Sequence, residues 1–552
     1  MASPAVVNAN EAPRRSIAAC VHDPVQIAGY EWRWLVIVSC ILVAASLAPL
    51  FLSAAATGPD WAFMGVTHNY QDAATYLSKM RIGYDGGWLL QFMHTPETHD
   101  GALMVVLYVA LGHVARITGL DLVVVYQLAR VIASLAMYIS LYVLGSVLWT
   151  QAGTRRLFLI IAALGAGFGW LAAPLTGRVN FPDLAIPEMF PFYSSLVNAH
   201  FPLAIAALAL LAAQFVLVIR PTDSNTPLWP VLGTMLLALA LTFLYPQGLV
   251  PFAGAVVIYL AHLRLRTGSF PRGALLHTVA MIAPAVPMAL YIGLVVRLNP
   301  AFAEWNRQNV TLSPPLWLML VGLGLPLLLG VPALARAARR LDRDGDRLML
   351  WWLIMIGVAM FLPTNVQRRF GVGLMIPVAF FAVRALRDFW LPRLGKRAGN
   401  LLLATALLLM TLTTIMTTIV PVVPLLAGAP EERLGIVLPV GYRGAMDWLN
   451  NHAAPGAVVL AAPEASAWIP GMTGTRVVYG HAFETLDAET KLAQVTAWYT
   501  FAAGDDCQAL LEEFAVRYVL FGPLEAALGQ GACLEGMTGV ASYDNVIVYA
   551  AL

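Results

Sequence analysis

Long apolar stretches alternate with short polar loops as far as about residue 425, and this pattern predicts a bundle of membrane-spanning helices. A helix that crosses a bilayer needs about 20 apolar residues. Stretches that meet or approach this length lie at 33–55, 121–149, 157–175, 200–219, 228–245, 247–263, 274–296, 315–335, 347–363, 370–390 and 398–422. A further apolar stretch, 101–118, is short and is interrupted by His113 and Arg116.

Basic residues indicate which loops lie inside. Lysines and arginines gather in the loops at 155–156, 220, 264–272, 336–343 and 393–397. Because positively charged loops stay on the cytoplasmic side, all of these lie inside if the N-terminus is cytoplasmic and 101–118 does not cross. We therefore predict about eleven crossings, with 101–118 as a re-entrant or interfacial helix and the C-terminal part outside.

The pattern changes near residue 430, where short β-branched runs alternate with helical periodicity. The runs lie at 457–462, 475–480, 517–522 and 545–550, and the helical patterns at 442–453, 489–503 and 507–515. Strands spaced by helices favour a compact α/β domain. The predicted fold is thus an α-helical polytopic bundle of about 11–12 helices with a C-terminal extracytoplasmic α/β domain. The predicted divisions are a cytoplasmic tail (1–32), a transmembrane domain (33–425) with a first outer loop (56–100), and the α/β domain (426–552).

Composition supports this organisation. Hydrophobic residues make up 59% of the chain, charged residues only 12%, and the mean hydropathy is +0.73. A soluble domain has about 25% charged residues, so the chain is predicted to be an integral membrane protein. We expect a multi-pass protein of the plasma (inner) membrane. A net charge of +2 gives no indication of a nucleic-acid partner. Residues 33–55 are interpreted as an uncleaved signal anchor, since no small-residue cleavage site follows closely.

Two of the four cysteines, Cys507 and Cys533, lie in the α/β domain. They can form a disulfide if this domain faces an oxidising compartment, or they can be two unpaired thiols.

The first outer loop is unusually rich in acids and histidines for a connection between membrane helices. It contains the stretch HNYQDAATYLSKMRIGYDGGWLLQFMHTPETHD at 68–100. Asp72 begins a predicted helical face, where a carboxylate can be a cap or a dipole partner. It can equally accept a proton from a substrate or hold a metal. His68, Asn69 and His99 are candidate substrate contacts in the same loop.

The order of features resembles a known family. The stretches that carry the resemblance are QDAATYLSKMRIGYDGGWL, HDGALMVVLYVALGHVARITGLDL and VYQLARVIASLAMYISLYVL. They are similar to the C-type membrane glycosyltransferases, in particular the protein O-mannosyltransferase and aminoarabinose transferase group. The resemblance covers roughly residues 33–175.

The resemblance implies a helical bundle with an outward-facing active site, a sugar donor carried on polyprenyl phosphate, and inversion at the sugar. It implies that Asp72 is the catalytic base and that Arg130 corresponds to the arginine of the family's long helix. Members usually have a second acid after the base, whereas this chain has Ala73. That departure leaves open the activity and any need for a divalent metal; no other cofactor is expected.

Arginines offer candidate sites for the donor phosphate. Arg368 and Arg369 are predicted on the outer side, where their guanidinium groups can grip a lipid phosphate or simply reach the headgroups. Arg130 lies inside an apolar stretch, which favours a functional role, although Asp121 or Glu188 can serve as a structural partner.

Other polar residues of the outer face are weaker candidates for substrate binding. Glu188 and His200 can face the cavity, or His200 can be a helix cap. The segment with Trp305, Asn306 and Gln308 suits sugar hydroxyls or an interfacial anchor. In the α/β domain, His481 and Glu484 follow a predicted strand and can meet the membrane site from above.

These features together predict a membrane enzyme that transfers a sugar from a polyprenyl-phosphate donor on the extracytoplasmic face. Two alternatives stay open: a transporter or flippase of lipid-linked sugars, and a non-catalytic assembly protein. The sequence identifies neither the sugar nor the acceptor.

Overall fold

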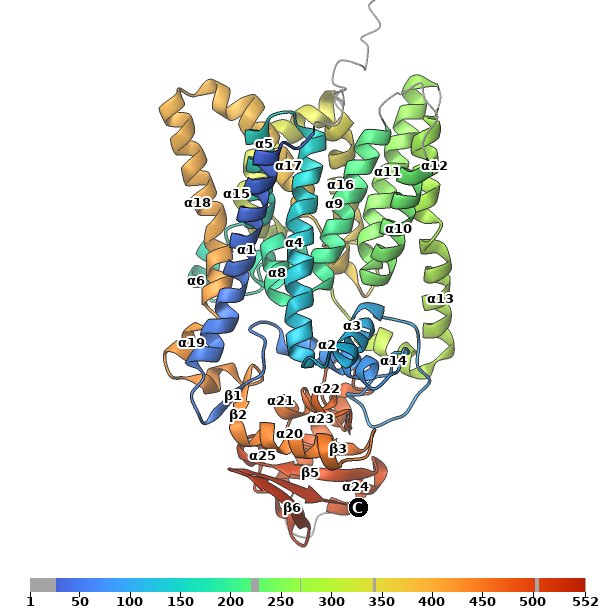
Figure 1. The fold of residues 1–552 in the computed structure, drawn as a ribbon, viewed down its shortest axis with the longest axis vertical. Coiled ribbons are helices and arrows are strands. Elements are labelled where there is room, and N and C mark those ends of the chain that lie inside the picture. The colour runs from blue at the N-terminus through green and yellow to red at the C-terminus, as the bar shows by residue number, and fades with distance from the viewer. Residues whose placement is uncertain (1–25, 220–227, 269, 341–343, 502–505, 552) are drawn as a thin grey trace, which may run out of the picture.

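A bundle of long helices forms most of the molecule, with a smaller α/β domain packed against one end (Figure 1). The computed structural model describes residues 26–219, 228–268, 270–340, 344–501 and 506–551. Most of the predicted N-terminal tail (1–32) and the basic residue at 220 therefore lie outside the described residues. The main helices of the bundle are α1 (Gly29–Ala56), α4 (Leu122–Leu148), α5 (Ala152–Leu164), α6 (Gly169–Thr176), α9 (His200–Val218), α10 (Leu228–Leu244), α11 (Pro246–Thr267), α12 (Arg272–Ile282), α13 (Ala285–Leu298), α15 (Leu316–Arg340), α16 (Asp344–Ala359), α17 (Met375–Ala385) and α18 (Lys396–Ile419).

Each apolar stretch predicted to cross the membrane is helical. Within the described residues, nine helices are long and apolar enough to span a bilayer. The shorter α10 and α16 account for the two remaining stretches. The structure thus confirms a polytopic helical membrane protein with a C-terminal α/β domain. Short segments connect the helices: α7 (Pro182–Ala185), η2 (Pro187–Met189), α8 (Pro191–Val197), α14 (Pro300–Gln308), η3 (Gln367–Gly371) and α19 (Val423–Leu426).

The stretch predicted as an interfacial helix forms α3 (Val106–Thr118), which lies at the end of the bundle next to the α/β domain (Figure 1). It packs beside α2 (Tyr70–Tyr84) with the two backbones almost in contact. A Cβ atom added to Gly112 of α3 would lie 1.8 Å from the carbonyl oxygen of Met80 in α2. Only a residue without a side chain fits there, so glycine fixes how closely α2 approaches α3.

The α/β domain contains a five-stranded sheet in the order β4-β3-β5-β7-β6. Strands β4, β3 and β5 are parallel, and β7 is antiparallel to both β5 and β6. The strands are β3 (Val458–Leu460), β4 (Arg476–Val477), β5 (Val516–Phe521), β6 (Thr538–Tyr543) and β7 (Val546–Ala550). The helices of this domain are α20 (Val440–His452), α21 (Pro463–Ser466), α22 (Ile469–Thr473), α23 (Ala488–Thr500), α24 (Cys507–Glu513) and α25 (Pro523–Leu528).

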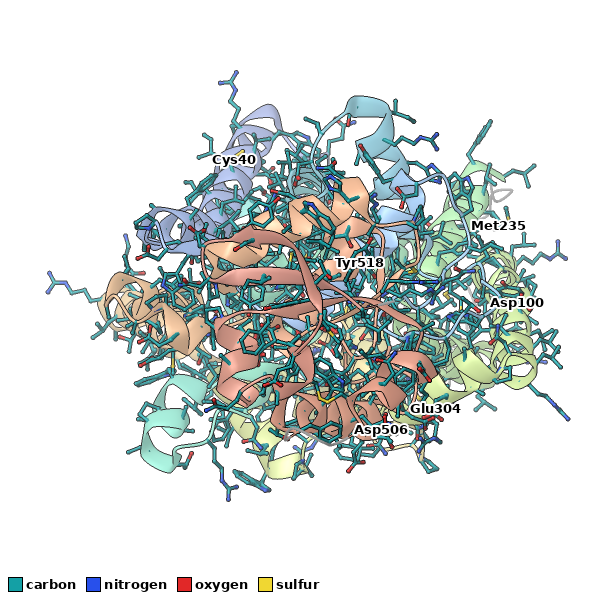
Figure 2. The ribbon with its side chains drawn as sticks, turned by 90° about the horizontal axis from the view of Figure 1, so that it is seen from below. Cys40, Asp100, Met235, Glu304, Asp506 and Tyr518 are labelled. Carbon is teal, nitrogen blue, oxygen red and sulfur yellow. A yellow bond between two sulfur atoms is a disulfide. The ribbon has the colours of Figure 1, made fainter. Side chains whose placement is uncertain are left out.

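The α/β domain and the first outer loop share one hydrophobic core. Leu77 and Met80 of α2 belong to the same buried cluster as Leu449, Trp468 and Ile469 of the α/β domain. A two-stranded antiparallel sheet also joins them, since β1 (Trp61–Phe63) pairs with β2 (Val437–Pro439). Viewed from below, the strands of the α/β domain cover the centre of this end of the bundle (Figure 2). Helix α2 is therefore held between the bundle and the α/β domain.

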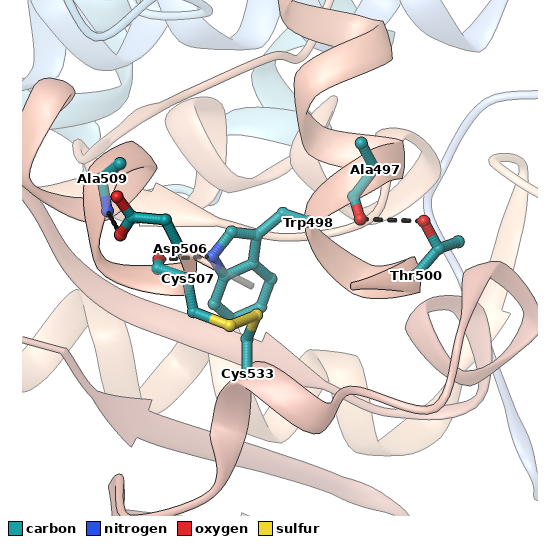
Figure 3. Close-up of a disulfide and its surroundings, with 7 residues drawn as sticks. All are labelled: Ala497, Trp498, Thr500, Asp506, Cys507, Ala509 and Cys533. Atoms are coloured by element: carbon teal, nitrogen blue, oxygen red, sulfur yellow. Dashed lines mark hydrogen bonds between the residues drawn. A yellow bond between two sulfur atoms is a disulfide. The ribbon is translucent and has the colours of Figure 1, made fainter. Parts of the chain in front are cut away.

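Cys507 and Cys533 form a disulfide with their Cα atoms 5.3 Å apart. The indole Nε1 of Trp498 donates a hydrogen bond to the Cys507 carbonyl oxygen at 3.0 Å, beside the bridge (Figure 3). Of the two arrangements left open by the sequence, the structure has the paired one.

Candidate active site

Asp72 lies in the first turn of α2, which begins after Asn69. The Asn69 backbone is left-handed (φ 42°), and its side chain makes no capping hydrogen bond. Its amide Nδ2 instead donates to Asp72 Oδ2. Thr75 Oγ1 donates to the Asp72 carbonyl oxygen at 2.9 Å. The Asp72 carboxylate is therefore not a helix cap; it lies at the positive end of the helix dipole with 37% of its side chain exposed.

Asp72 faces a cavity of about 320 Å³ at the junction between the bundle and the α/β domain. Residues from α2, α3, α10, α13, α14, η3 and the loop after β4 line it. Seven of the residues singled out in the sequence are on its wall: Asp72, His200, Trp305, Asn306, Arg369, His481 and Glu484.

One wall of the cavity is apolar and close to the outside of the bundle. Met288, Ile292 and Val296 of α13 line it, together with Leu103 and Leu244. Every residue of α13 is partly or fully exposed, although the helix is strongly apolar. In a membrane protein such a face is covered by lipid, so α13 separates the cavity from the hydrocarbon by a single helix.

The two neighbouring arginines of η3 reach different places. Arg369 lines the cavity, and its Nη2 donates a hydrogen bond to Asn309 Oδ1 at 2.7 Å. Arg368 is directed toward the buried Glu188, with Nε 3.9 Å from Glu188 Oε1. Arg369 is thus the arginine that the structure brings to the same cavity as Asp72, whereas Arg368 and Glu188 are not among the lining residues.

The α/β domain closes the cavity with the loop between β4 and α23. His481 Nε2 lies 3.7 Å from Asp72 Oδ1. Glu484, three residues further, forms a buried ion pair with Lys79 of α2, and its second oxygen lies 3.6 Å from His94 Nδ1. Residues more than 400 positions apart in the sequence therefore meet at one site.

The environment of Asp72 favours its charged form. Burial in the cavity by itself raises the pKa of the Asp72 carboxyl, but the imidazole of His481, the Arg369 guanidinium and the Asn69 amide outweigh it and lower the pKa below its ordinary value. Tyr76, one turn along α2, shows the opposite effect, because burial beside the Asp72 charge raises the pKa of its phenol well above the ordinary value. Asp72 is therefore an ionised carboxylate able to accept a proton.

Three of the residues predicted to contact substrate lie off the cavity wall and form hydrogen bonds within the protein. His68 contacts the Thr417 carbonyl oxygen of α18 through Nε2 at 2.8 Å. His99 Nε2 accepts a hydrogen bond from the Phe92 amide at 2.9 Å. Gln308 Nε2 donates to the Thr485 carbonyl oxygen at 2.8 Å, which ties α14 to the α/β domain. None of the three lines the cavity.

Arg130 is buried in α4, away from the cavity wall. Its Nη1 donates to the Ser195 carbonyl oxygen at 2.5 Å, and its Nε donates to Gln127 Oε1 at 2.7 Å. Neither of the partners suggested by the sequence is used, since Asp121 instead caps the start of α4.

Ala73, which stands where the resembling family usually has a second acid, is 2% exposed and belongs to the core shared by α2 and the α/β domain. It does not line the cavity. An acid at this position would be buried among apolar residues, so its absence does not change the charge of the cavity wall.

Sequence reasoning missed two kinds of site residue. Lys79 has the appearance of a solvated helix lysine, and only its distance from Asp72, two helical turns, places it on the same face. An aromatic group was also missed: Tyr76 stacks on Tyr108 with centroids 4.3 Å apart, and Tyr108 Oη lies 2.8 Å from His200 Nδ1. His200 is consequently satisfied by a tyrosine and does not cap α9, whose N-cap is Ala199.

The donor set around Asp72 does not fit a divalent metal. Such an ion prefers several oxygen ligands, but Asp72 Oδ2 accepts a hydrogen bond from the Asn69 amide Nδ2, and Oδ1 faces Nε2 of His481. Among the described residues, no group of three or more His, Cys, Asp or Glu side chains has an arrangement able to hold a metal.

The fold and site define a polytopic membrane protein with an acid–base cavity between its helical bundle and an α/β cap. This fold is shared with solved membrane glycosyltransferases. Over 95% of its length the chain is similar to the oligosaccharyltransferase of Archaeoglobus fulgidus, with 12% identity, a TM-score of 0.53 and 75% of that chain covered. It is also similar over 95% of its length to ArnT from Cupriavidus metallidurans bound to undecaprenyl phosphate, with 16% identity, a TM-score of 0.51 and 99% of that chain covered.

The archaeal oligosaccharyltransferase has also been solved with an inhibitory peptide and a dolichol-phosphate (12% identity, TM-score 0.52, covering 95% of this chain and 75% of that one). No family model matches the chain, and no curated protein matches its sequence. The predicted resemblance to C-type membrane glycosyltransferases is confirmed at the level of the fold.

Proposed function

We propose that this protein transfers a sugar from a polyprenyl-phosphate donor to an acceptor on the extracytoplasmic face. The observation that carries the proposal is a single cavity with three different parts. It has an ionised carboxylate at Asp72, a guanidinium at Arg369, and an apolar wall at α13. A polyprenyl-phosphate sugar offers a matching series of a hydroxyl-rich head, an anionic phosphate and a hydrocarbon tail.

Each part of the proposed donor matches one group of residues in the cavity. The phosphate lies at Arg369, whose hydrogen bond to Asn309 directs the guanidinium and leaves its other N–H groups for phosphate oxygens. The prenyl chain runs along Met288 and Ile292 toward the lipid. The sugar lies near Trp305 and Asn306, because an aromatic face and amide groups suit sugar hydroxyls.

The reaction needs a base and a stabilised leaving group. Asp72 accepts the proton of the acceptor hydroxyl, and the acceptor oxygen forms a bond to the anomeric carbon. The bond between that carbon and the phosphate oxygen breaks on the opposite face, so the sugar configuration inverts. Polyprenyl phosphate leaves with the bonding electron pair, and Arg369 stabilises its added negative charge in a partly dry site.

The other two arginines receive supporting roles in this proposal. Arg368 is directed toward Glu188 and does not line the cavity, so we assign it to supporting η3, which carries Arg369. Arg130 uses its N–H groups on Ser195 and Gln127, so we assign it to the packing of α4 below the site.

We also propose that the protein lies in the plasma (inner) membrane with its N-terminus in the cytoplasm and its α/β domain outside. The positive loops support this orientation. The disulfide between Cys507 and Cys533 supports it independently, because such bonds persist in oxidising compartments.

The test uses purified protein in lipid nanodiscs, polyprenyl-phosphate hexose and pentose donors with a radiolabelled sugar, and membranes of the source cell as acceptors. We expect release of polyprenyl phosphate together with a labelled product. Asp72→Asn lowers this rate about 10²- to 10⁴-fold, the usual contribution of a positioned general base. Arg369→Gln lowers it about 10²- to 10³-fold through loss of charge stabilisation at the leaving group.

Two matched controls accompany these variants. Asp85→Asn removes an acid at the other end of α2, and Arg307→Gln removes an exposed arginine of α14. Both keep the wild-type rate. Full activity of Asp72→Asn, or movement of donor across sealed vesicles without any covalent transfer, would contradict the proposal, the latter in favour of a flippase.

A further inference from the structure

The loop between β4 and α23 carries its histidine in a fixed orientation. Thr485 Oγ1 accepts hydrogen bonds from the Gly480 and His481 amides at 3.1 Å and donates to the His94 carbonyl oxygen at 2.6 Å. The ion pair of Glu484 with Lys79 holds the same loop against α2. His481 itself is buried, so its ring cannot turn freely.

The hydrogen bonds of the ring identify which nitrogen carries the proton. His481 Nδ1 faces two backbone N–H donors, those of Phe483 at 3.1 Å and Glu484 at 3.3 Å. A nitrogen that accepts from amides must present its lone pair, so the proton lies on Nε2. Nε2 is the atom that lies 3.7 Å from Asp72 Oδ1. This distance is longer than that of a hydrogen bond, and such contacts often shorten when a substrate binds in the site.

The Asp72 carboxylate thus has an N–H donor on each side. Asn69 Nδ2 serves Oδ2 from the start of α2, and His481 Nε2 faces Oδ1 from the α/β domain. A carboxylate has about four lone-pair positions, so the Asn69 hydrogen bond and the facing His481 N–H restrict its plane and still leave room for an incoming hydroxyl. One of these donors comes from a different domain.

We infer that His481 of the α/β domain is a positioning residue that orients the Asp72 carboxylate for proton transfer through a neutral Nε2–H donor. This inference rests on the proposed function for its catalytic meaning, but the contact itself can be tested without turnover. It gives the α/β domain a direct part in the site, in addition to covering it.

Other charged and titratable groups lie in the surroundings of Asp72 and must be held constant in the test. Arg369 of η3, Glu188 of η2, Tyr76 of α2 and His200 of α9 interact with Asp72 electrostatically. Lys79 of α2 lines the same cavity. Glu484 lies beside His481 on its own loop. The variants are therefore confined to the ring of His481, which leaves all of these groups in place.

The first measurement reads the protonation of Asp72 directly. Dicyclohexylcarbodiimide modifies protonated carboxyls, and mass spectrometry of the purified protein gives the extent of modification at Asp72 across pH, with Asp72→Asn as the blank. His481→Leu removes the donor, so the pH midpoint of modification shifts upward by about one unit. His481→Gln keeps an N–H group in a similar place and returns the midpoint close to the wild-type value. His452→Leu, an exposed histidine of α20, is the matched control and leaves it unchanged.

The second measurement is the pH dependence of donor consumption with the polyprenyl-phosphate hexose and pentose donors. His481→Leu lowers kcat about tenfold to a hundredfold through misplacement of the base, with the donor KM unchanged, and moves the acid limb of the profile upward. His481→Gln recovers most of kcat.

The two measurements separate the two hypotheses. An unchanged modification midpoint in a folded His481→Leu protein overturns the positioning role, whatever the activity. A shifted midpoint in a protein that consumes no donor supports the contact and contradicts the proposed function instead. A fall in kcat that His481→Gln fails to rescue, with an unmoved pH profile, also overturns the positioning role.

Discussion

Replacement of Glu484 with glutamine should destabilise the protein strongly, because it leaves Lys79 as a buried cation without its counter-ion. The side chains of Lys79 and Glu484 are only 4% and 9% exposed, and the pair joins α2 to the α/β domain. Removal of one partner from a buried ion pair costs about 3–5 kcal/mol. The pair of Glu304 and Arg307 is more accessible to solvent, with side chains 20% and 69% exposed, so its loss should change the stability very little.

The assay is thermal unfolding of the purified protein in detergent, followed by scanning fluorimetry. Glu484→Gln and Lys79→Met should each lower Tm by several degrees, whereas Glu304→Gln should leave it nearly unchanged. The double variant Lys79→Met/Glu484→Gln should lose clearly less than the sum of the two single variants, since it leaves no unpaired charge. If Glu484→Gln lowered Tm no more than Glu304→Gln does, the reasoning from burial would be refuted.

The same pair predicts how stability depends on pH. Burial by itself raises the pKa of the Glu484 carboxyl, but Lys79 and His94 outweigh it and hold the pKa far below its ordinary value. The unfolded chain has an ordinary carboxyl, so the stability from this group is fully present above the ordinary pKa and disappears as the pH falls through the lowered one. The Glu484→Gln protein should therefore lack the decrease in Tm that acidification causes in the wild type through this carboxyl.

Two further perturbations test the disulfide of the α/β domain and the close contact between α2 and α3. Reduction of the bridge between Cys507 and Cys533, which are 26 residues apart, should destabilise the α/β domain by about 3.5 kcal/mol from loop entropy, measured as a lower Tm in dithiothreitol. The substitution Gly112→Ala places a methyl group 1.8 Å from the Met80 carbonyl oxygen. It should destabilise the protein by about 1–3 kcal/mol and lower its activity, because α2 is displaced. The control Gly293→Ala has open space around it and should have neither effect.

Much of the fold could be predicted from the sequence because its elements have strong local patterns. The apolar stretches became helices, the runs at 457–462, 475–480 and 545–550 contain β3, β4 and β7, and the run at 517–522 overlaps β5. Strand β6 was missed because Thr538–Tyr543 contains Gly, Ala and Ser and is largely exposed, so no alternation marks it. The pairing of β1 with β2 was also invisible, since each has three residues and nearly 400 positions separate them.

The site was harder to predict because side-chain direction and long-range contacts decide it. Arg368 and Arg369 look equivalent in the sequence, yet adjacent residues of a 3₁₀ turn point in different directions, and only Arg369 reaches the cavity. Lys79 carries no signal of burial by itself, because its partner Glu484 lies 405 residues away. The helix start at Asp72, by contrast, follows from local periodicity and is found within two residues of its predicted place.

The position of the α/β domain at the end of the chain also sets an order of events during biosynthesis. Asp72 leaves the ribosome early, with the first helices, whereas the loop that carries His481 and Glu484 emerges only after the last membrane helix, α18. Until that segment has folded onto α2, the Asp72 carboxylate lacks the His481 Nε2 that faces it, and Lys79 lacks its Glu484 counter-ion. A nascent chain therefore lacks part of the wall of the Asp72 cavity, and any truncation before β4 leaves out both His481 and Glu484.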